Sequence, residues 1–68
     1  MTAKISVNGE PRQIAEGATV AQLLDELELT GKYVAVEVNL HLVPGAKHAQ
    51  YRLAEGDRLE IVTLVGGG

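Results

Sequence analysis

KISVNGEPRQIAEGATVAQLLDEL, residues 4–27, carries most of the information about the fold. Residues 4–7 alternate polar and apolar side chains, as a half-buried strand does, and Asn8-Gly9 follows them. Asn-Gly after such a run is a strong hairpin signal, because both residues tolerate a positive φ. We predict a second strand at about residues 10–15. Pro11 cannot donate a ladder hydrogen bond, so this strand should lie at a sheet edge.

A helix is predicted to follow the hairpin. Thr19 is suited to the N-cap, and Gln22 lies three residues later, so the two can form a capping box. Apolar residues then recur at i, i+3, i+4 and i+7 and form one stripe: Val20, Leu23, Leu24 and Leu27. Gly31 suits the position just after the last turn. The pattern predicts a helix over about residues 20–29.

The second half of the chain favours strands. Alternating valines predict a strand at about residues 33–38, and a short strand is expected near 50–53. Pro44-Gly45 marks a turn in the segment between them, and Glu55-Gly56-Asp57 marks another. The last strand is predicted to run over residues 58–65.

This order of elements predicts an α+β protein of the β-grasp (ubiquitin-like) type. One main helix must cover one face of a small mixed sheet of four to five strands. The strand that enters the helix and the strand that leaves it can pair in parallel through a right-handed crossover. A split β-α-β fold is the alternative, but it needs a second helix that the pattern does not show. We expect one β-grasp domain at residues 1–65 and a flexible glycine tail at 66–68.

Composition narrows the function. The chain has 68 residues, a net charge of −3 and six Lys/Arg without a basic cluster, which disfavours binding to nucleic acid or to an anionic membrane. The acidic surplus serves solubility or forms a face for a basic partner. No run approaches the ~20 apolar residues of a membrane span. We expect a cytoplasmic protein that is a monomer when free.

The usual catalytic and metal-binding patterns are missing from the sequence. There is no cysteine, and Ser6 is the only serine, with no histidine near it. His41 and His48 are seven residues apart, which matches no metal motif, so both are expected on the surface or in loops. We therefore expect no bound cofactor or metal and no enzymatic activity of the chain itself.

The run Gly66-Gly67-Gly68 is the unusual feature. It can be a frayed end. It can also be functional, because glycine lacks a Cβ and three extended residues reach about 10 Å, enough to bring a terminal carboxylate into another protein's narrow channel. Such a carboxylate can attack the α-phosphate of ATP, and the acyl-adenylate can then yield a thiocarboxylate. A partner enzyme would supply the positioning and the charge stabilisation.

The last predicted strand also offers a docking surface. Burying Glu60 would be costly, so Leu59, Ile61 and Thr63 are predicted to face the core. Val62 and Leu64 then share the outer face with Glu60, and two exposed aliphatic side chains beside the tail suggest a partner-binding patch. The alternative is a β-bulge that turns one of them inward.

The sequence resembles the ThiS family of sulfur carriers over nearly its whole length. The matching segments are Val7–Glu10, Thr19–Leu24, Val34–Asn39, Val43-Pro44, Glu55–Val62 and Val65–Gly68. The resemblance implies that a ThiF-like enzyme uses ATP to adenylate the terminal glycine, and that the glycine becomes a thiocarboxylate. The sulfur would come from cysteine through a desulfurase and would pass to a ThiG-like thiazole synthase, which forms the thiazole ring of thiamine.

The resemblance also assigns roles to the tail. Gly68 would carry the thiocarboxylate, or Gly67 would after trimming, and Gly66 and Gly67 would occupy the enzyme channel. Four other functions stay open. They are a sulfur carrier for molybdopterin, a carrier for another thiolation route, a non-catalytic β-grasp interaction module, and a modifier attached through isopeptide bonds.

Overall fold

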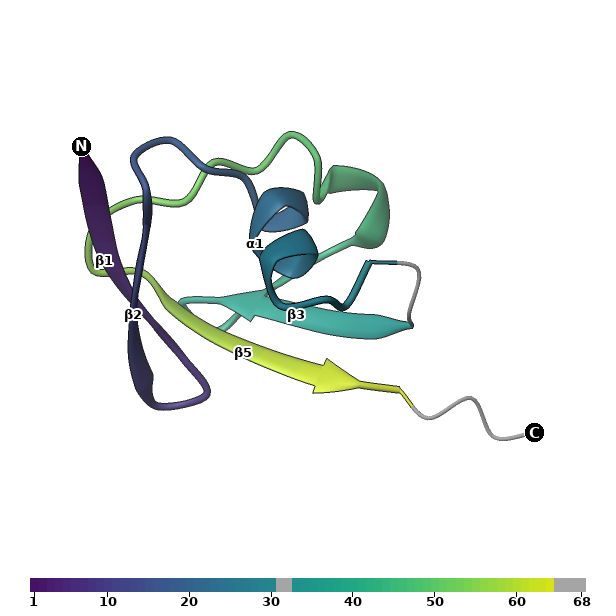
Figure 1. Cartoon of the computed structure of the whole chain (residues 1–68). Helices are drawn as coiled ribbons and strands as arrows, with labels where there is room; N and C mark the ends of the chain where they lie inside the picture. Colours follow the sequence, from purple (N-terminus) through teal and green to yellow (C-terminus); the bar gives the residue numbers. More distant parts are fainter. Residues whose placement is uncertain (31–32, 65–68) are drawn as a thin grey trace.

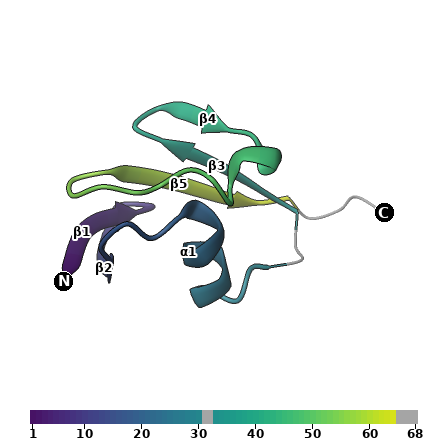
Figure 2. The ribbon, with the colours of Figure 1, turned by 90° about the horizontal axis from the view of Figure 1, so that it is seen from above.

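The computed structural model describes residues 1–30 and 33–64. Its elements are β1 (Thr2–Val7), β2 (Glu10–Ala15), α1 (Val20–Glu26), β3 (Val34–Val38), β4 (His41–Val43), the 3₁₀ turn η1 (Gly45–Lys47) and β5 (Arg58–Thr63). The strands form one sheet in the order β2-β1-β5-β3-β4; Figure 1 labels the first four of them, and Figure 2 shows β4 beside β3. Helix α1 lies on one side of this sheet (Figure 2). This arrangement confirms the predicted β-grasp fold.

The sheet is mixed, as predicted, but the parallel pair differs from the expectation. β1 and β5 pair in parallel, whereas β1–β2, β3–β4 and β3–β5 are antiparallel. The strands on either side of the helix, β2 and β3, are not neighbours. Because β5 lies between β1 and β3, the last strand becomes the centre of the sheet.

The core lies between the helix and the sheet and is aliphatic. Its buried members are Ala3, Ile5, Ile14, Ala18, Val20, Leu23, Leu24, Val36, Val38, Val43, Leu53, Leu59 and Ile61. Within the described residues no polar or charged side chain is buried. No helix in this part of the chain is long and apolar enough to cross a membrane.

The hairpin and the helix start agree with the sequence. Asn8 and Gly9 have φ values of 52° and 85°, and β2 lies at a sheet edge. The capping box is present: the Gln22 backbone N–H donates to Thr19 Oγ1 at 3.1 Å, and the Thr19 N–H donates to Gln22 Oε1 at 2.9 Å. Each side chain satisfies a donor that the first turn leaves free.

The helix ends earlier than predicted, at Glu26 rather than near residue 29. Glu28 adopts a φ of 60°, its N–H donates to the Asp25 carbonyl at 3.0 Å, and the Leu29 N–H donates to the Leu24 carbonyl at 2.8 Å. These two bonds make a Schellman motif without glycine, which ends the helix and turns Leu29 back toward the core. Gly31, predicted to follow the last turn, lies outside the described residues.

The prediction of a short strand near residues 50–53 is wrong. Arg52 forms only a single bridge with Thr19, and the short strand is β4 at His41–Val43. A tight turn at Asn39 and Leu40, with φ values of 52° and 71°, leads into β4. Leucine rarely adopts a positive φ, so the sequence showed no turn signal there. The Asn39 side chain supports the turn, since its Nδ2 donates to Asp57 Oδ1 and its Oδ1 accepts from the Arg58 N–H, each at 3.0 Å.

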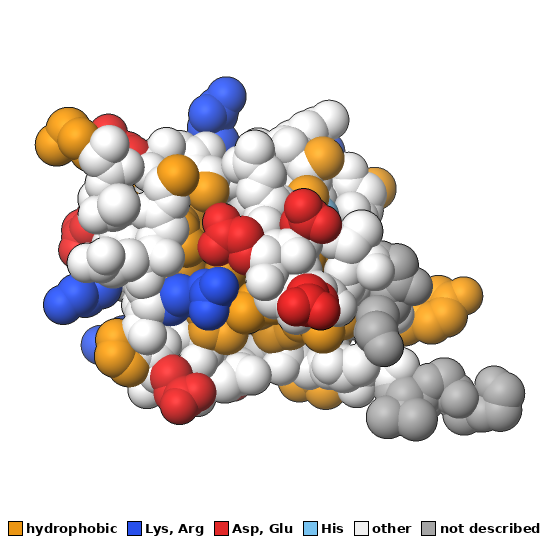
Figure 3. Space-filling model, viewed as in Figure 1, with side chains coloured by type: hydrophobic (Ala, Val, Ile, Leu, Met, Phe, Trp, Pro, Cys, Tyr) orange, Lys and Arg blue, Asp and Glu red, His pale blue; other side chains and the backbone are white. Residues whose placement is uncertain are grey.

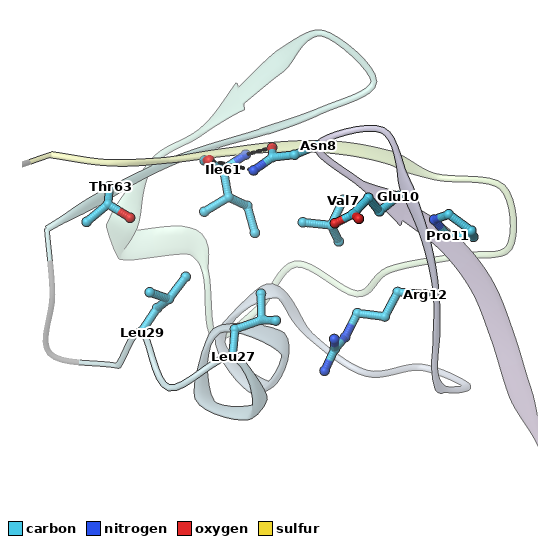
Figure 4. Close-up of a pocket in the computed structure, with 9 residues that line it drawn as sticks. All are labelled: Val7, Asn8, Glu10, Pro11, Arg12, Leu27, Leu29, Ile61 and Thr63. Atoms are coloured by element: carbon cyan, nitrogen blue, oxygen red, sulfur yellow. Dashed lines mark hydrogen bonds between the residues drawn. The ribbon is translucent and has the colours of Figure 1, made fainter.

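The last strand is shorter than the predicted range of 58–65 and ends at Thr63. Leu59 and Ile61 are buried as predicted; Thr63 lies on the core side of the strand as predicted, but it is exposed. Thr63 lies two residues after Ile61 in the strand, so both side chains point to the helix side of the sheet, as Figure 4 shows. The early end of the helix leaves it uncovered. Val65 lies outside the described residues.

Candidate functional site

The end of β5 is held from both sides of the strand. Leu59 and Ile61 anchor it beneath the helix, with exposed fractions of 1% and 8%. On the β3 side the register runs without a break from Val38↔Leu59 to Val34↔Thr63, and the Leu64 N–H then donates to the Tyr33 carbonyl at 2.7 Å. This unbroken register excludes the alternative of a β-bulge. The direction in which the chain leaves the sheet is therefore fixed as far as Leu64.

On the β1 side, the Asn8 side chain continues the strand pairing beyond the end of β1. Backbone pairing of β1 with β5 covers Ser6↔Arg58 and Val7↔Leu59. Beyond it, Asn8 Nδ2 donates to the Ile61 carbonyl at 3.0 Å, and Asn8 Oδ1 accepts from the Ile61 N–H at 2.7 Å (Figure 4). The amide group thus replaces the next residue of a parallel strand. The sequence indicated only a turn role for Asn8, because its partner is 53 residues away.

We expect Asn8→Gly to loosen the end of β5. Glycine keeps the positive φ of the turn but removes both side-chain bonds to Ile61, which should lower the free energy of unfolding by about 1–3 kcal/mol. Amide hydrogen exchange at Ile61 should become faster. Asn8→Asp is the matched control, because it retains the acceptor for the Ile61 N–H. We call the two side-chain bonds from Asn8 to Ile61 the Asn8 clamp. An unchanged exchange rate at Ile61 in Asn8→Gly would contradict its role in holding β5.

The outer face of the sheet, opposite the helix, carries the predicted aliphatic patch. Val62 and Leu64 are 56% and 52% exposed, as the alternation around Glu60 predicted. Leu42 of β4 is 64% exposed, and Ala35 of β3 lies directly opposite Val62. We call Ala35, Leu42, Val62 and Leu64 the outer patch. Leu42 was not predicted to belong to this patch, because no strand was predicted at residues 41–43.

A groove opens on the helix side between α1, the hairpin and β5. It has a volume of about 470 Å³ and is lined by Val7, Asn8, Glu10, Pro11, Arg12, Leu27, Leu29, Ile61 and Thr63. Figure 3 shows a band of hydrophobic surface between the helix and β5, with acidic side chains gathered over the helix. The ion pair of Arg12 Nη2 with Glu26 Oε1, at 3.5 Å, joins β2 to α1. The groove results from the short helix, so no pattern in the sequence could have indicated it.

Neither a hydrogen-bonded Ser–His pair nor a metal-binding cluster is present among the described residues. No hydrogen bond joins Ser6 to a histidine there, and residues 1–30 and 33–64 contain no group of three or more His, Cys, Asp or Glu suited to a metal ion. His41 is exposed on β4. His48 is half-buried, with Nε2 at 3.0 Å from the Val43 carbonyl. The predicted tail residues Gly66, Gly67 and Gly68 lie outside the described residues.

Comparisons with known proteins point to one family. Residues 5–68 match the ThiS family. A sulfur carrier protein ThiS of Thermus thermophilus is 39% identical over 62 residues, which are 91% of this chain and 95% of the relative. The crystal structure of a thiamine biosynthesis protein (ThiS) from Geobacter metallireducens superposes with a TM-score of 0.80 at 31% identity, over 96% of this chain and 99% of that chain.

One further relative is much longer than this chain. A protein named thiazole synthase from Paramagnetospirillum magneticum is 46% identical over 65 residues. These are 96% of this chain but only 20% of the length of that protein. In that relative, a segment similar to this whole chain is therefore part of a larger polypeptide.

Proposed function

Because the chain belongs to the ThiS family of sulfur carriers in thiamine biosynthesis, we propose that its terminal glycine, Gly68, carries sulfur as a thiocarboxylate. The single observation that carries this proposal is the family match, which extends through residue 68 and so includes the glycine run. Such a role requires no catalytic side chain in the chain itself, because a carrier provides the reacting end and its partners provide the catalysis.

The proposed chemistry has three steps. In the first, an oxygen of the Gly68 carboxylate attacks the α-phosphate of ATP on a ThiF-like adenylating enzyme, and pyrophosphate leaves. In the second, a sulfur nucleophile attacks the acyl-adenylate carbonyl, and AMP leaves with the bridging oxygen. The nucleophile would be the outer sulfur of a persulfide supplied by a cysteine desulfurase, and the product is an acyl disulfide. In the third, a thiol attacks the donor's sulfur of this S–S bond, the thiol and the donor end as a disulfide, and the thiocarboxylate leaves. Gly66 and Gly67 would lie in the enzyme channel, where the absence of a Cβ allows a close fit.

A thiazole synthase is the proposed acceptor of the sulfur. The support is the relative named thiazole synthase, of which a segment similar to this chain forms part. A carrier and its acceptor on one polypeptide meet at a high effective concentration, as partners that act together do. An acceptor in molybdopterin formation or in another thiolation route remains the alternative, and none of the relatives described above supports it.

The test of the proposed function is the intact mass of the protein. The chain is incubated with ATP, the adenylating enzyme and a sulfur donor. A sulfur carrier gains the mass difference between a sulfur and an oxygen atom, and omission of ATP prevents the gain. A protein that keeps its mass under all conditions is an inert interaction module, and one that appears in higher-mass conjugates is a modifier. Either result would refute the proposal.

We expect Leu64→Glu to weaken binding to the adenylating enzyme at least about tenfold, which corresponds to 1.4 kcal/mol. The substitution places a charge in the outer patch, which we propose as the docking surface through Val62 and Leu64. Leu64 is half-exposed and follows the strand, so thermal stability should hardly change. Ala15→Glu, on exposed edge strand β2, is the matched control. Normal binding by Leu64→Glu, or its unfolding, would disprove the role of the patch.

A further inference from the structure

Two glutamates lie directly opposite each other on the outer face of the sheet. Glu37 of β3 pairs in register with Glu60 of β5, and both side chains are exposed. Directly opposed residues in an antiparallel pair have Cβ atoms about 4.5–5.5 Å apart, and like charges at this distance destabilise the sheet. This repulsion lies between two strands at the centre of the sheet and destabilises the free protein. We therefore looked for an interaction that would compensate it.

Nothing in the described part of the chain neutralises this pair. Its only ion pair joins Arg12 to Glu26, on the helix side of the sheet. No hydrogen bond among these residues involves either carboxylate of the pair. Arg58 shares the outer face with Glu60, two residues along β5, but it forms no salt bridge with Glu37 or Glu60. Both negative charges therefore stay available to a partner.

The pair borders the outer patch. The next cross-strand pair toward the end of β5 is Ala35↔Val62, and Leu42 of β4 lies opposite Glu37 on its other side. The two carboxylates thus lie beside the exposed aliphatic side chains of Val62 and Leu42 on the outer face, with Arg58 on the opposite side of Glu60 along β5. An apolar contact that excludes water around a charged group strengthens its electrostatic interaction with an opposite charge.

We propose that Glu37 and Glu60 together bind an arginine side chain of the adenylating enzyme when that enzyme docks on the outer patch. This inference rests on the proposed function and names the chemistry of its docking surface. A guanidinium group is planar and presents several N–H donors in a fixed fork, so it can donate to two neighbouring carboxylates at once. Its positive charge would also relieve the repulsion between the two glutamates. Because this repulsion destabilises the free protein, its relief favours the complex.

The test compares the double variant Glu37→Gln/Glu60→Gln with Glu16→Gln/Glu28→Gln. Both remove two negative charges, but Glu16 and Glu28 are exposed residues that lie outside the strands of the sheet. Binding to the adenylating enzyme is measured at low and high salt. The Glu37/Glu60 variant should bind at least about tenfold more weakly at low salt and lose most of its salt dependence, since the steering charges are gone. The Glu16/Glu28 variant should bind as the wild type does.

Stability provides a second readout that separates recognition from folding. Loss of the like-charge pair should raise the thermal midpoint of the Glu37/Glu60 variant by a few degrees, so weaker binding cannot come from misfolding. Unchanged affinity, equal losses in both double variants, or a loss seen only with a thiazole synthase would overturn the inference. The intact-mass gain of the wild type tests the proposed function separately, and it can succeed while this inference fails.

Discussion

A variant that lacks Gly67 and Gly68 is expected to stay folded and to accept no sulfur. Among residues 1–30 and 33–64, the buried core residues lie between Ala3 and Ile61, so the truncation leaves this core in place. It does shorten the extended tail by about 7 Å, at roughly 3.3–3.6 Å per residue, so the terminal carboxylate reaches less far from the domain. A misplacement of 1 Å can cost about 10²-fold in rate, so the truncated chain should react at least about 10²-fold more slowly. ATP-dependent pyrophosphate release and intact mass measure the effect.

A chain with all three glycines and an amide at Gly68 is the matched control. It has the full reach of the tail but lacks the nucleophilic carboxylate, so it should dock normally and remain unadenylated. If the truncated or the amidated chain gained sulfur at the wild-type rate, the proposed chemistry at the terminal glycine would be excluded.

Leu23→Ala is expected to have the largest effect on stability. Leu23 is fully buried at the centre of the core, on the apolar stripe of α1. Leucine-to-alanine changes in cores cost about 2–5 kcal/mol. A single core of this size supplies only about 3–5 kcal/mol, so most of the stability should be lost. Thermal unfolding followed by circular dichroism measures the change.

Leu42→Ala is the control for the same chemical change at an exposed position. Leu42 is 64% exposed on β4, so its loss should alter the thermal midpoint only slightly. If Leu23→Ala and Leu42→Ala had equal effects, the core between α1 and the sheet would be wrongly described.

The elements that the sequence predicted well depend on local chemistry. Asn8-Gly9 needs only its own backbone preference to form a turn, and Thr19 with Gln22 caps the helix within four residues. The alternation around Glu60 likewise predicted which side chains of β5 face outward. These features were confirmed because no distant contact was needed to produce them.

The features that were missed depend on contacts between distant parts of the chain. The turn at Asn39-Leu40 is held by hydrogen bonds to Asp57 and Arg58, which allow a leucine with positive φ. β4 could therefore not be recognised from its own three residues. The clamp from Asn8 to Ile61 has the same origin.

Two parts of the outer face show how far the site itself could be predicted. Val62 and Leu64 followed from strand alternation alone. Leu42 joined the outer patch only through the pairing of β3 with β4, and the opposition of Glu37 and Glu60 only through the register of β3 with β5. The register between two strands that are distant in sequence cannot be predicted from either strand alone.

The most direct measurement of the central claim is fragmentation of the intact protein after reaction with ATP, the adenylating enzyme and the sulfur donor. We predict that every fragment containing Gly68 gains the mass difference between sulfur and oxygen, and that all fragments lacking it keep their mass. A gain located on any other residue, or a terminal glycine that retains its ordinary carboxylate, would contradict the account.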